Sequence, residues 1–445
     1  MLAAGASDLD VKAEIGGCVM RVLEKRRRLV GLGALGVVAV VVLTACTPAA
    51  EPSTSPSPTP EASTPEPYAG PAAFVGDELE SFLLTPEEII GLVPEATEVG
   101  DASAVLEQVS DGGGAPASPA ICEAFYAEQS LGSVGARVID WKVPTDPEYG
   151  FGRLLVLQFA DETLAQARMD QLMRAAEQCA EFSKEGTATF DAVIPEDAEN
   201  TRAFAGTLRD DALGWHSFDA FASTGNVIVQ LWQPFTGDRT FDAESAAVLL
   251  QSRAEEARTA LIDDLTENPP VQEEDPAADP AAPWADWQIG VGGVGPLSLG
   301  GEIDDVIAAA EGAQVIEPEY EGGPTKLVNG EGTGSMLVQP VEGGTTVWKI
   351  TVGDERIFDE GEQDGEVLPA RTGVRVGALI SEAMAAFPEG TIVDVASSGD
   401  DFYAVSNREG QVFRFHSDRD AVEGAATIIG ITVEDGKAAK SAVFG

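Results

Sequence analysis

Cysteine and histidine are the residue types best suited to catalysis or metal binding, and this chain has few of either. Its 445 residues include four Cys and two His. His216 and His416 each lie on a predicted strand without a second His nearby, so the sequence favours neither a zinc site nor a Ser-His-Asp triad. A lone His on a strand is more often structural than catalytic. We therefore expect no metal, no cofactor and no enzymatic activity.

Carboxylates are abundant, with 75 Asp and Glu against 27 Lys and Arg and a net charge of −48. Such a charge repels nucleic acid and anionic lipid head groups, so we expect no nucleic-acid partner. An envelope hydrolase that uses a pair of carboxylates stays open as the alternative function. The distance between two carboxylates is a three-dimensional property that the sequence does not give.

The beginning of the chain has the pattern of an export signal. Basic residues up to Arg28 precede an uncharged apolar run, which ends in Leu43-Thr44-Ala45-Cys46. This tetrapeptide resembles the lipobox of bacterial lipoproteins, which implies that Cys46 is acylated, with palmitate among its lipids, and becomes the first mature residue. A plain signal peptide or an anchor helix with an accidental Cys is the alternative.

This resemblance implies a protein held by lipid on the extracytoplasmic face of the cell membrane. Residues 1–19 lack the features of a signal peptide and precede a second Met at position 20. We therefore interpret 1–19 as a misassigned leader and 20–45 as the lipoprotein signal peptide.

Cys122 and Cys179 are predicted to form a disulfide, since two Cys in an oxidising compartment normally pair. The bond would close a loop of nearly 60 residues and stabilise the fold by roughly 4 kcal/mol on the chain-entropy model. A metal site is the weaker interpretation, because no His lies near either Cys.

Composition divides the mature chain into two globular parts. Residues 46–70 are rich in Pro, Ser and Thr and are expected to form an extended tether. The acidic, Pro-rich segment 267–283 is predicted to link a domain at 71–266 to a second domain at 284–445. Because the linker is poor in apolar residues, we expect few contacts across it and independent folding of the two domains.

The first domain is predicted to be α+β, with an antiparallel sheet and helices packed on one side. Thr85 and Glu88 form a capping box at a helix start, and Asp161 precedes a longer helix whose apolar stripe includes Cys179. The segment 223–226 is a hairpin signal between two strands.

Three tryptophans, Trp141, Trp215 and Trp232, lie on predicted strands of this sheet. They are candidates to line a groove for a small apolar or sugar ligand, and the alternative is that they belong to the core.

Motifs in this domain resemble a known family. Segments 82–88 and 119–122, with a second Cys in the following long helix, are similar to the extracellular sensor domain of some mycobacterial serine/threonine kinases and related lipoproteins. The resemblance implies ligand sensing or binding through a cleft.

The second domain contains an internal repeat. Residues 299–310 align with 376–387, and 348–352 align with 429–433, so each repeat is expected to be a short helix followed by antiparallel strands. This pattern resembles tandem helix-plus-meander modules of bacterial envelope proteins, such as those of beta-lactamase inhibitor protein, and implies an α+β fold with helices on one side of a sheet.

Taken together, the sequence predicts a cell-surface lipoprotein with two α+β domains and a non-enzymatic role. We expect the protein to bind or sense an envelope protein or a small ligand. Its predicted association with the membrane is through the lipid on Cys46.

Overall fold

A computed structural model describes residues 67–438, except 110–115, 147–149, 197, 213, 215, 357–362 and 397. These residues belong to one compact unit, Thr64–Gly445. The predicted leader, the signal peptide, Cys46 and nearly all of the tether lie outside the described residues. Among the helices of the described part, none combines the length and apolar character that crossing a bilayer requires.

The first half of the described chain is built on a seven-stranded sheet with the order β2-β3-β8-β7-β6-β5-β4. Every pair of neighbours in this sheet is antiparallel. Its strands are β2 (Gly135–Lys142), β3 (Phe151–Gln158), β4 (Phe182–Ser183), β5 (Thr187–Val193), β6 (Arg202–Asp210), β7 (His216–Thr224) and β8 (Val227–Phe235). Around it are η2 (Gly76–Phe82), α1 (Pro86–Leu92), η3 (Ala120–Phe125), α2 (Glu162–Gln178) and α3 (Ala243–Glu267), with β1 (Val105–Gln108) outside this sheet.

Local signals in the sequence begin and end these elements as predicted. The Thr85 side chain accepts a hydrogen bond from the backbone N–H of Glu88, and the Glu88 carboxylate accepts one from the backbone N–H of Thr85. These two bonds cap the start of α1. Asp161 caps α2 through Leu164. The β7–β8 hairpin turns at Gly225, whose φ of +52° favours glycine.

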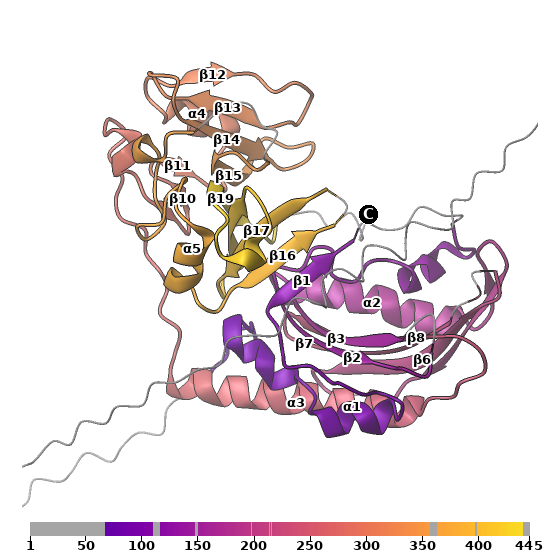
Figure 1. The fold of residues 1–445 in the computed structure, drawn as a ribbon. Helices are drawn as coiled ribbons and strands as arrows, with labels where there is room; N and C mark the ends of the chain where they lie inside the picture. Colours follow the sequence, from indigo (N-terminus) through magenta and orange to yellow (C-terminus); the bar gives the residue numbers. More distant parts are fainter. Residues whose placement is uncertain are drawn as a thin grey trace, which may run out of the picture. The chain divides into compact units, whose positions relative to one another are not determined.

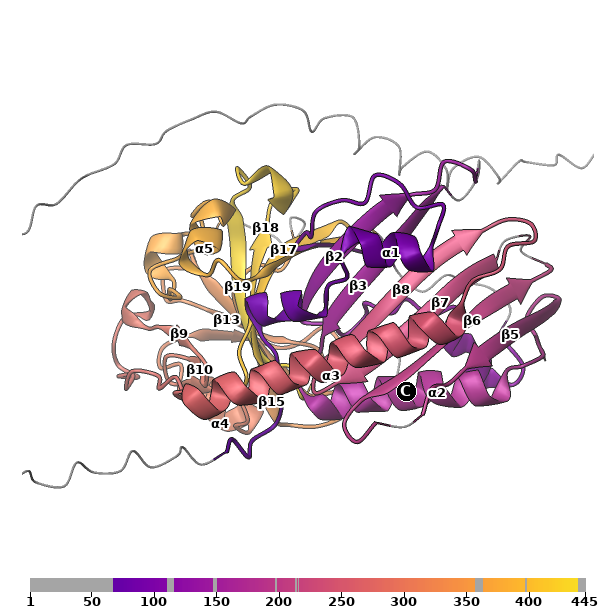
Figure 2. The ribbon, with the colours of Figure 1, turned by 90° about the horizontal axis from the view of Figure 1, so that it is seen from below.

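Helices cover both faces of this sheet, which corrects the prediction that they pack on one side (Figure 1). Neighbouring residues on a strand point to opposite faces, and Val138 and Ile139 of β2 belong to different core clusters. The cluster of Ile139 contains Leu250 of α3, and the cluster of Val138 contains Leu172 of α2. Figure 2 shows α3 running obliquely across the strands. The sheet is therefore the middle layer of three.

The predicted disulfide between Cys122 and Cys179 is confirmed. The two Cα atoms lie 5.8 Å apart, and both residues are buried in the core beneath α2. The bond joins η3 to the end of α2, where Cys179 is the C-cap residue. The disulfide therefore fixes the short helix η3 to the end of α2 on this face of the sheet.

The second half is a nine-stranded sheet with the order β1-β16-β17-β18-β19-β15-β14-β13-β12. Its own strands are β12 (Gln314–Ile316), β13 (Thr325–Val328), β14 (Ser335–Pro340), β15 (Val347–Gly353), β16 (Thr391–Val395), β17 (Asp400–Ser406), β18 (Gln411–Ser417) and β19 (Ile428–Asp435). A small antiparallel sheet contains β9 (Ile289–Gly290), β10 (Gly293–Val294) and β11 (Leu297–Ser298). The helical turns are η4 (Trp284–Asp286), α4 (Ile303–Ala308), η5 (Gly365–Val367), α5 (Ile380–Ala386) and η6 (Ala421–Glu423).

The predicted repeat is present, because α4 precedes the meander β12–β15 and α5 precedes the meander β16–β19. The two meanders join through β15 and β19, where Ile350 lies opposite Val433. Both residues share one core cluster with Val306 of α4 and Ile380 of α5. Here the helices do pack on one face of the sheet, as predicted. The opposite face carries polar side chains such as Arg414 and His416, together with a small apolar cluster of Val393, Phe402 and Ala404.

Contacts between the two halves are more extensive than the sequence predicts. Strand β1 of the first half pairs in parallel with β16 of the second (Figure 1). The Thr391 hydroxyl accepts a hydrogen bond of 2.9 Å from the backbone N–H of Ala136, and Arg408 forms an ion pair with Glu78. The expectation of few contacts between the two halves is therefore wrong. The contacts are made by strand pairing and by side chains outside the linker, so the composition of the linker does not predict them. Independent folding of each half stays a prediction.

The acidic linker is itself bound to the second half. Glu273 accepts hydrogen bonds of 2.7 and 3.0 Å from the Arg371 guanidinium. The carboxylate of Asp275 accepts from the backbone N–H groups of Val291 and Gly292, at 2.7 and 2.5 Å. The carboxylates of the linker thus accept hydrogen bonds from a buried arginine side chain and from backbone N–H groups of a turn.

Asn226, at the turn between β7 and β8, joins three segments through its side-chain amide. Its oxygen accepts from the backbone N–H of Phe74 at 2.7 Å, and its nitrogen donates to the backbone oxygens of Phe74 and Phe159 at 3.1 and 2.9 Å. The residue is 1% exposed. Because no water reaches these groups, the amide is the partner on which they depend.

We predict that Asn226→Ala lowers the free energy of unfolding by about 2 to 4 kcal/mol, because it leaves buried backbone groups without partners. Chemical denaturation of wild type and variant measures the loss. The matched control is Asn200→Ala at an exposed position, which should change stability by no more than about 0.5 kcal/mol. Equal effects of the two substitutions would show that the Asn226 amide is not a structural clamp.

Candidate functional site

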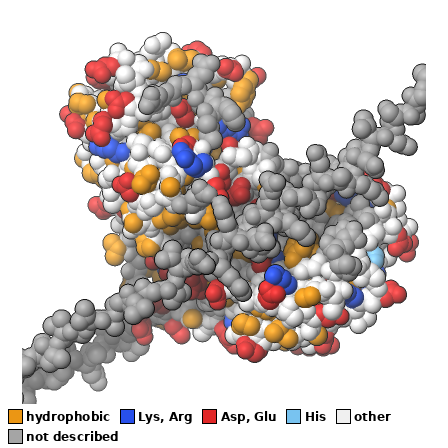
Figure 3. All heavy atoms as spheres, viewed as in Figure 1, with side chains coloured by type: hydrophobic (Ala, Val, Ile, Leu, Met, Phe, Trp, Pro, Cys, Tyr) orange, Lys and Arg blue, Asp and Glu red, His pale blue; other side chains and the backbone are white. Residues whose placement is uncertain are grey.

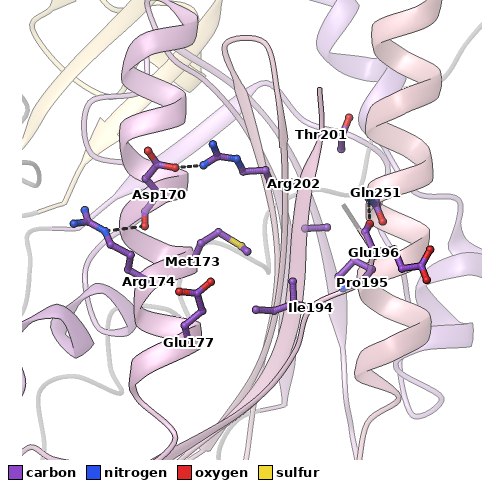
Figure 4. A pocket seen from close by; sticks show the side chains of 11 residues that line it. Asp170, Met173, Arg174, Glu177, Ile194, Pro195, Glu196, Thr201, Arg202 and Gln251 are labelled. Carbon is purple, nitrogen blue, oxygen red and sulfur yellow. Dashed lines mark hydrogen bonds and ion pairs between the residues drawn. The ribbon is translucent and has the colours of Figure 1, made fainter. Parts of the chain in front are cut away.

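A hollow of the first half lies between α2 and α3, at the connection from β5 to β6 (Figure 4). Its volume is about 510 Å³, which is in the range of small-molecule sites. Side chains of α2 line one wall, Gln251 of α3 lies on the other, and the connecting segment lies between them. The site therefore depends on the three-layer packing that puts the two helices on opposite faces of the sheet.

Charged side chains on the α2 wall are held in place by one another. Arg202 at the start of β6 forms an ion pair with Asp170, and Arg174 donates a hydrogen bond of 3.2 Å to the backbone oxygen of Asp170. Glu177 lies one helical turn further along α2. This wall presents both signs of charge, so it can orient a polar or charged group of either sign.

Apolar side chains form the middle of the hollow. Met173 of α2 and Ile194 of the connection lie in the space between the two helices (Figure 4). Pro195 and Ala203 extend this surface. Ile194 is 40% exposed, so its apolar side chain is accessible to a molecule in the hollow.

The connecting segment is anchored to α3 rather than loose. The Gln251 side chain donates a hydrogen bond of 3.0 Å to the backbone oxygen of Glu196. Two smaller hollows, of about 430 and 130 Å³, adjoin the same segment and share Thr201 with the first. Residues 194–196 and 198–202 of this connection therefore line three hollows on the flank of the first half.

Trp141 and Trp232, the two described members of the predicted tryptophan groove, do not come together. Trp141 is 1% exposed and lies in the core cluster of α3. Its indole N–H donates a hydrogen bond of 2.7 Å to the side-chain oxygen of Gln233. Trp232 is next to Leu231 of that same cluster and so points to the opposite face, against Phe151 at 5.5 Å between rings. Trp215 lies outside the described residues. Of the two interpretations, membership of the core applies to Trp141, and neither described Trp lines the pocket.

Each histidine is held by a local hydrogen bond. The Nδ1 atom of His216 accepts from the backbone N–H of Asp210 at 3.3 Å, and the Nε2 atom of His416 lies 2.9 Å from the Thr432 hydroxyl. Burial, and then the nearby Arg209, lowers the pKa of His216. Burial lowers the pKa of His416 to about 4. Neither residue lines the pocket between α2 and α3.

Sequence reasoning missed the segment 194–202, because a connection between two strands carries no periodic pattern. Met173 lies on the predicted helix that follows Asp161, but a helical pattern does not say that this residue would meet Ile194. An Ile followed directly by Pro195 at the end of a strand is the signal that the sequence carries for a break at this point.

Surface charge is consistent with the composition. Figure 3 shows Asp and Glu side chains scattered over one face of the molecule, with fewer Lys and Arg. Within the described residues, no group of three or more His, Cys, Asp or Glu side chains is arranged to hold a metal ion.

A buried carboxyl was also missed. Asp219 of β7 is 5% exposed and accepts hydrogen bonds from the Ser217 hydroxyl at 2.5 Å and from the Gln230 amide at 3.3 Å. Burial raises the pKa of Asp219 to about 6, against the lowering effect of these two donors. The carboxyl therefore takes up a proton in the folded protein at a pH where an unfolded chain would release it.

This shift predicts a pH dependence of stability. The free energy of unfolding should fall by roughly 2 to 3 kcal/mol as the pH rises from about 4 to about 6, because the folded state binds the proton more tightly. Asp219→Asn should remove this component, whereas Asp191→Asn, at an exposed position of β5, should retain it. Denaturation series at several pH values give the difference between wild type and each variant. Parallel profiles for wild type and Asp219→Asn would contradict the prediction.

Comparisons with known proteins complete the description of the site. No model of a protein family matches the chain, and no curated protein matches it. Among solved structures, the chain is similar to the extracellular domain of PknH from Mycobacterium tuberculosis. The identity is 14%, the TM-score is 0.29, and the match covers 45% of this chain and 100% of that one. At this identity and TM-score the likeness assigns no function.

Proposed function

We propose that the protein is a lipid-anchored binding or sensing protein of the cell envelope, and that the pocket between α2 and α3 is its ligand site. The observation that carries the proposal is the combination of an exposed apolar surface, Met173 and Ile194, with fixed charges on the adjacent wall. Such a lining suits a ligand with an apolar body and a polar or charged end.

A binding role has more support than the alternative of an envelope hydrolase with a carboxylate pair. Asp170, the carboxylate at the centre of the charged wall, is engaged by Arg202. The Arg202 guanidinium occupies this carboxylate, whereas the two carboxylates of a hydrolase pair must face the bond that they cleave. The residues that line the pocket include no His, Cys or Ser, so nucleophilic catalysis by these groups has no support there.

A dye with an apolar body and one anionic group, 8-anilinonaphthalene-1-sulfonate, tests the pocket directly. We expect wild type to enhance the dye fluorescence in a saturable manner, and Ile194→Glu to reduce the affinity about tenfold, since it places a charge in the apolar middle. The control is Val248→Glu on α3, which alters an apolar side chain of similar exposure, 47% against 40%, and does not line the pocket.

Unfolding by the substitution is excluded by comparing the melting curves of the two variants. If wild type does not bind the dye, or if both variants bind it like wild type, the pocket is not the ligand site.

The anchor has a separate test. Cys46→Ser should block lipid transfer and leave an unprocessed precursor, because a serine hydroxyl does not replace the thiol nucleophile. Metabolic labelling with an alkyne-bearing fatty acid measures the acylation, and the control is Thr44→Ser, a conservative change in the same tetrapeptide that keeps the Cys46 thiol. Equal labelling of wild type and Cys46→Ser would remove the lipoprotein assignment but leave the pocket proposal intact.

A further inference from the structure

The face of the nine-stranded sheet that lies opposite its helices contains a second cavity. Its volume is about 220 Å³, and its lining comes from β15, β17, β18 and β19 together with the segment that follows β15. None of its residues belongs to the pocket proposed above. The cavity is therefore an independent feature of the second half.

Strand register explains why polar side chains gather here. Thr351 lies opposite Thr432, which lies opposite Arg414, so three neighbouring strands contribute one row. Two residues further along the strands, His416 lies opposite Phe402. Residues that alternate with these, such as Ile350, belong to the core on the other face. The polar lining thus follows from the same alternation that builds the core.

A β-bulge adds a large ring to this face. Lys349 pairs with Gln339 and Val347 pairs with Pro340, so Trp348 is the extra residue of β15. A bulge changes the direction of a side chain, and both Trp348 and Lys349 line the cavity. Phe402 lines it from β17, on the other side of β18 and β19. The cavity is therefore bordered by an aromatic ring on each side.

The charges of the cavity cancel in pairs. Lys349 lies 3.0 Å from Glu355, and Arg414 lies 2.7 Å from Glu434. A third pair at the rim joins Arg356 to Asp400 at 3.3 Å. Because each cation has its own carboxylate, the lining offers no net charge to attract an ion.

Hydrogen bonds hold the floor in one arrangement. The Thr351 hydroxyl donates to Glu355 at 2.6 Å and lies 2.8 Å from the Thr432 hydroxyl, which in turn contacts His416. Burial alone would raise the pKa of Glu355, but the charge of Lys349 leads the opposing effects and lowers it to about 2. The floor is thus a preorganised set of donors and acceptors.

We propose that this cavity binds one neutral sugar unit of a saccharide. Sugar hydroxyls both donate and accept, which matches a lining of paired charges, the Thr432 hydroxyl and the His416 imidazole. The C–H faces of a sugar ring pack against aromatic rings such as Trp348 and Phe402. A net-neutral lining favours a polyhydroxylated ligand over a phosphate or a metal ion. This inference does not rest on the function proposed for the first half.

Saturation-transfer-difference NMR on the full-length chain tests the proposal, in a buffer without sugars or sugar-headed detergents. The probes are glucose, galactose, mannose, N-acetylglucosamine and their disaccharides, with inorganic phosphate as the competing chemistry. We expect at least one saccharide to bind with a Kd of about 1 mM or tighter. Trp348→Ala should weaken this affinity about tenfold through loss of the ring contact.

Two substitutions of exposed arginines separate an effect on binding from an effect on folding. Arg356→Ala removes a rim cation with a 60% exposed side chain and should weaken saccharide binding several-fold. Arg419→Ala removes a comparably exposed arginine, at 59%, that does not line the cavity, and should bind like wild type.

Three results would overturn the proposal. The first is that no saccharide probe binds. The second is that a probe binds equally well to wild type, Trp348→Ala and Arg356→Ala. The third is that phosphate binds in an Arg356-dependent manner while the saccharides do not.

Discussion

The side-chain amide of Asn226 is the interaction on which much of the first half depends. It satisfies the backbone of Phe74 in both directions and that of Phe159, so it joins the entering chain, the end of β3 and the β7–β8 hairpin at one buried point. A backbone group at this depth has no water to replace a missing partner. The segment that precedes η2 is therefore held by the Asn226 amide together with core packing of Phe74, Leu79 and Phe82, and not by strand pairing.

The same entering chain connects the halves of the molecule. Arg408 of the second half bonds to the backbone oxygen of Ala73 and forms an ion pair with Glu78, immediately beside the residue that Asn226 holds. Strand β1 then extends the second sheet by pairing with β16. Parallel pairing of this kind covers what would otherwise be an exposed sheet edge. The linker and the strand pairing thus connect the halves at separate places, and folding of one half can influence the other.

Two sheets bury polar groups in different ways. The first sheet is covered on both faces, and Asp219 is buried there without a cation, so burial raises its pKa. The second sheet has helices on one face only, and its other face places Glu355 beside Lys349, which lowers the pKa of the carboxyl. Lowering the pH therefore stabilises the folded first half through protonation of Asp219. It destabilises the folded second half, because folding favours the neutral form of His416 and the ionised form of Glu355. The pairing of charges also makes the second face suitable for a neutral ligand.

The sequence by itself determined the elements and their local limits. Caps at Thr85 and Asp161 and the hairpin at Gly225 follow from neighbours in the chain, because capping and turn formation are local. The disulfide follows from the number of Cys in an oxidising compartment, although its partners are 57 residues apart. The helix-plus-meander repeat follows from the internal similarity of two segments. Only the tertiary structure decided which face each helix covers, how β1 crosses to the second sheet, and which side chains meet in a pocket. Ile194 and Met173 come from separate elements, and the alignment of Thr351 with Thr432 is set by strand register. These are relations between distant residues, and local patterns carry no information about the distance between them.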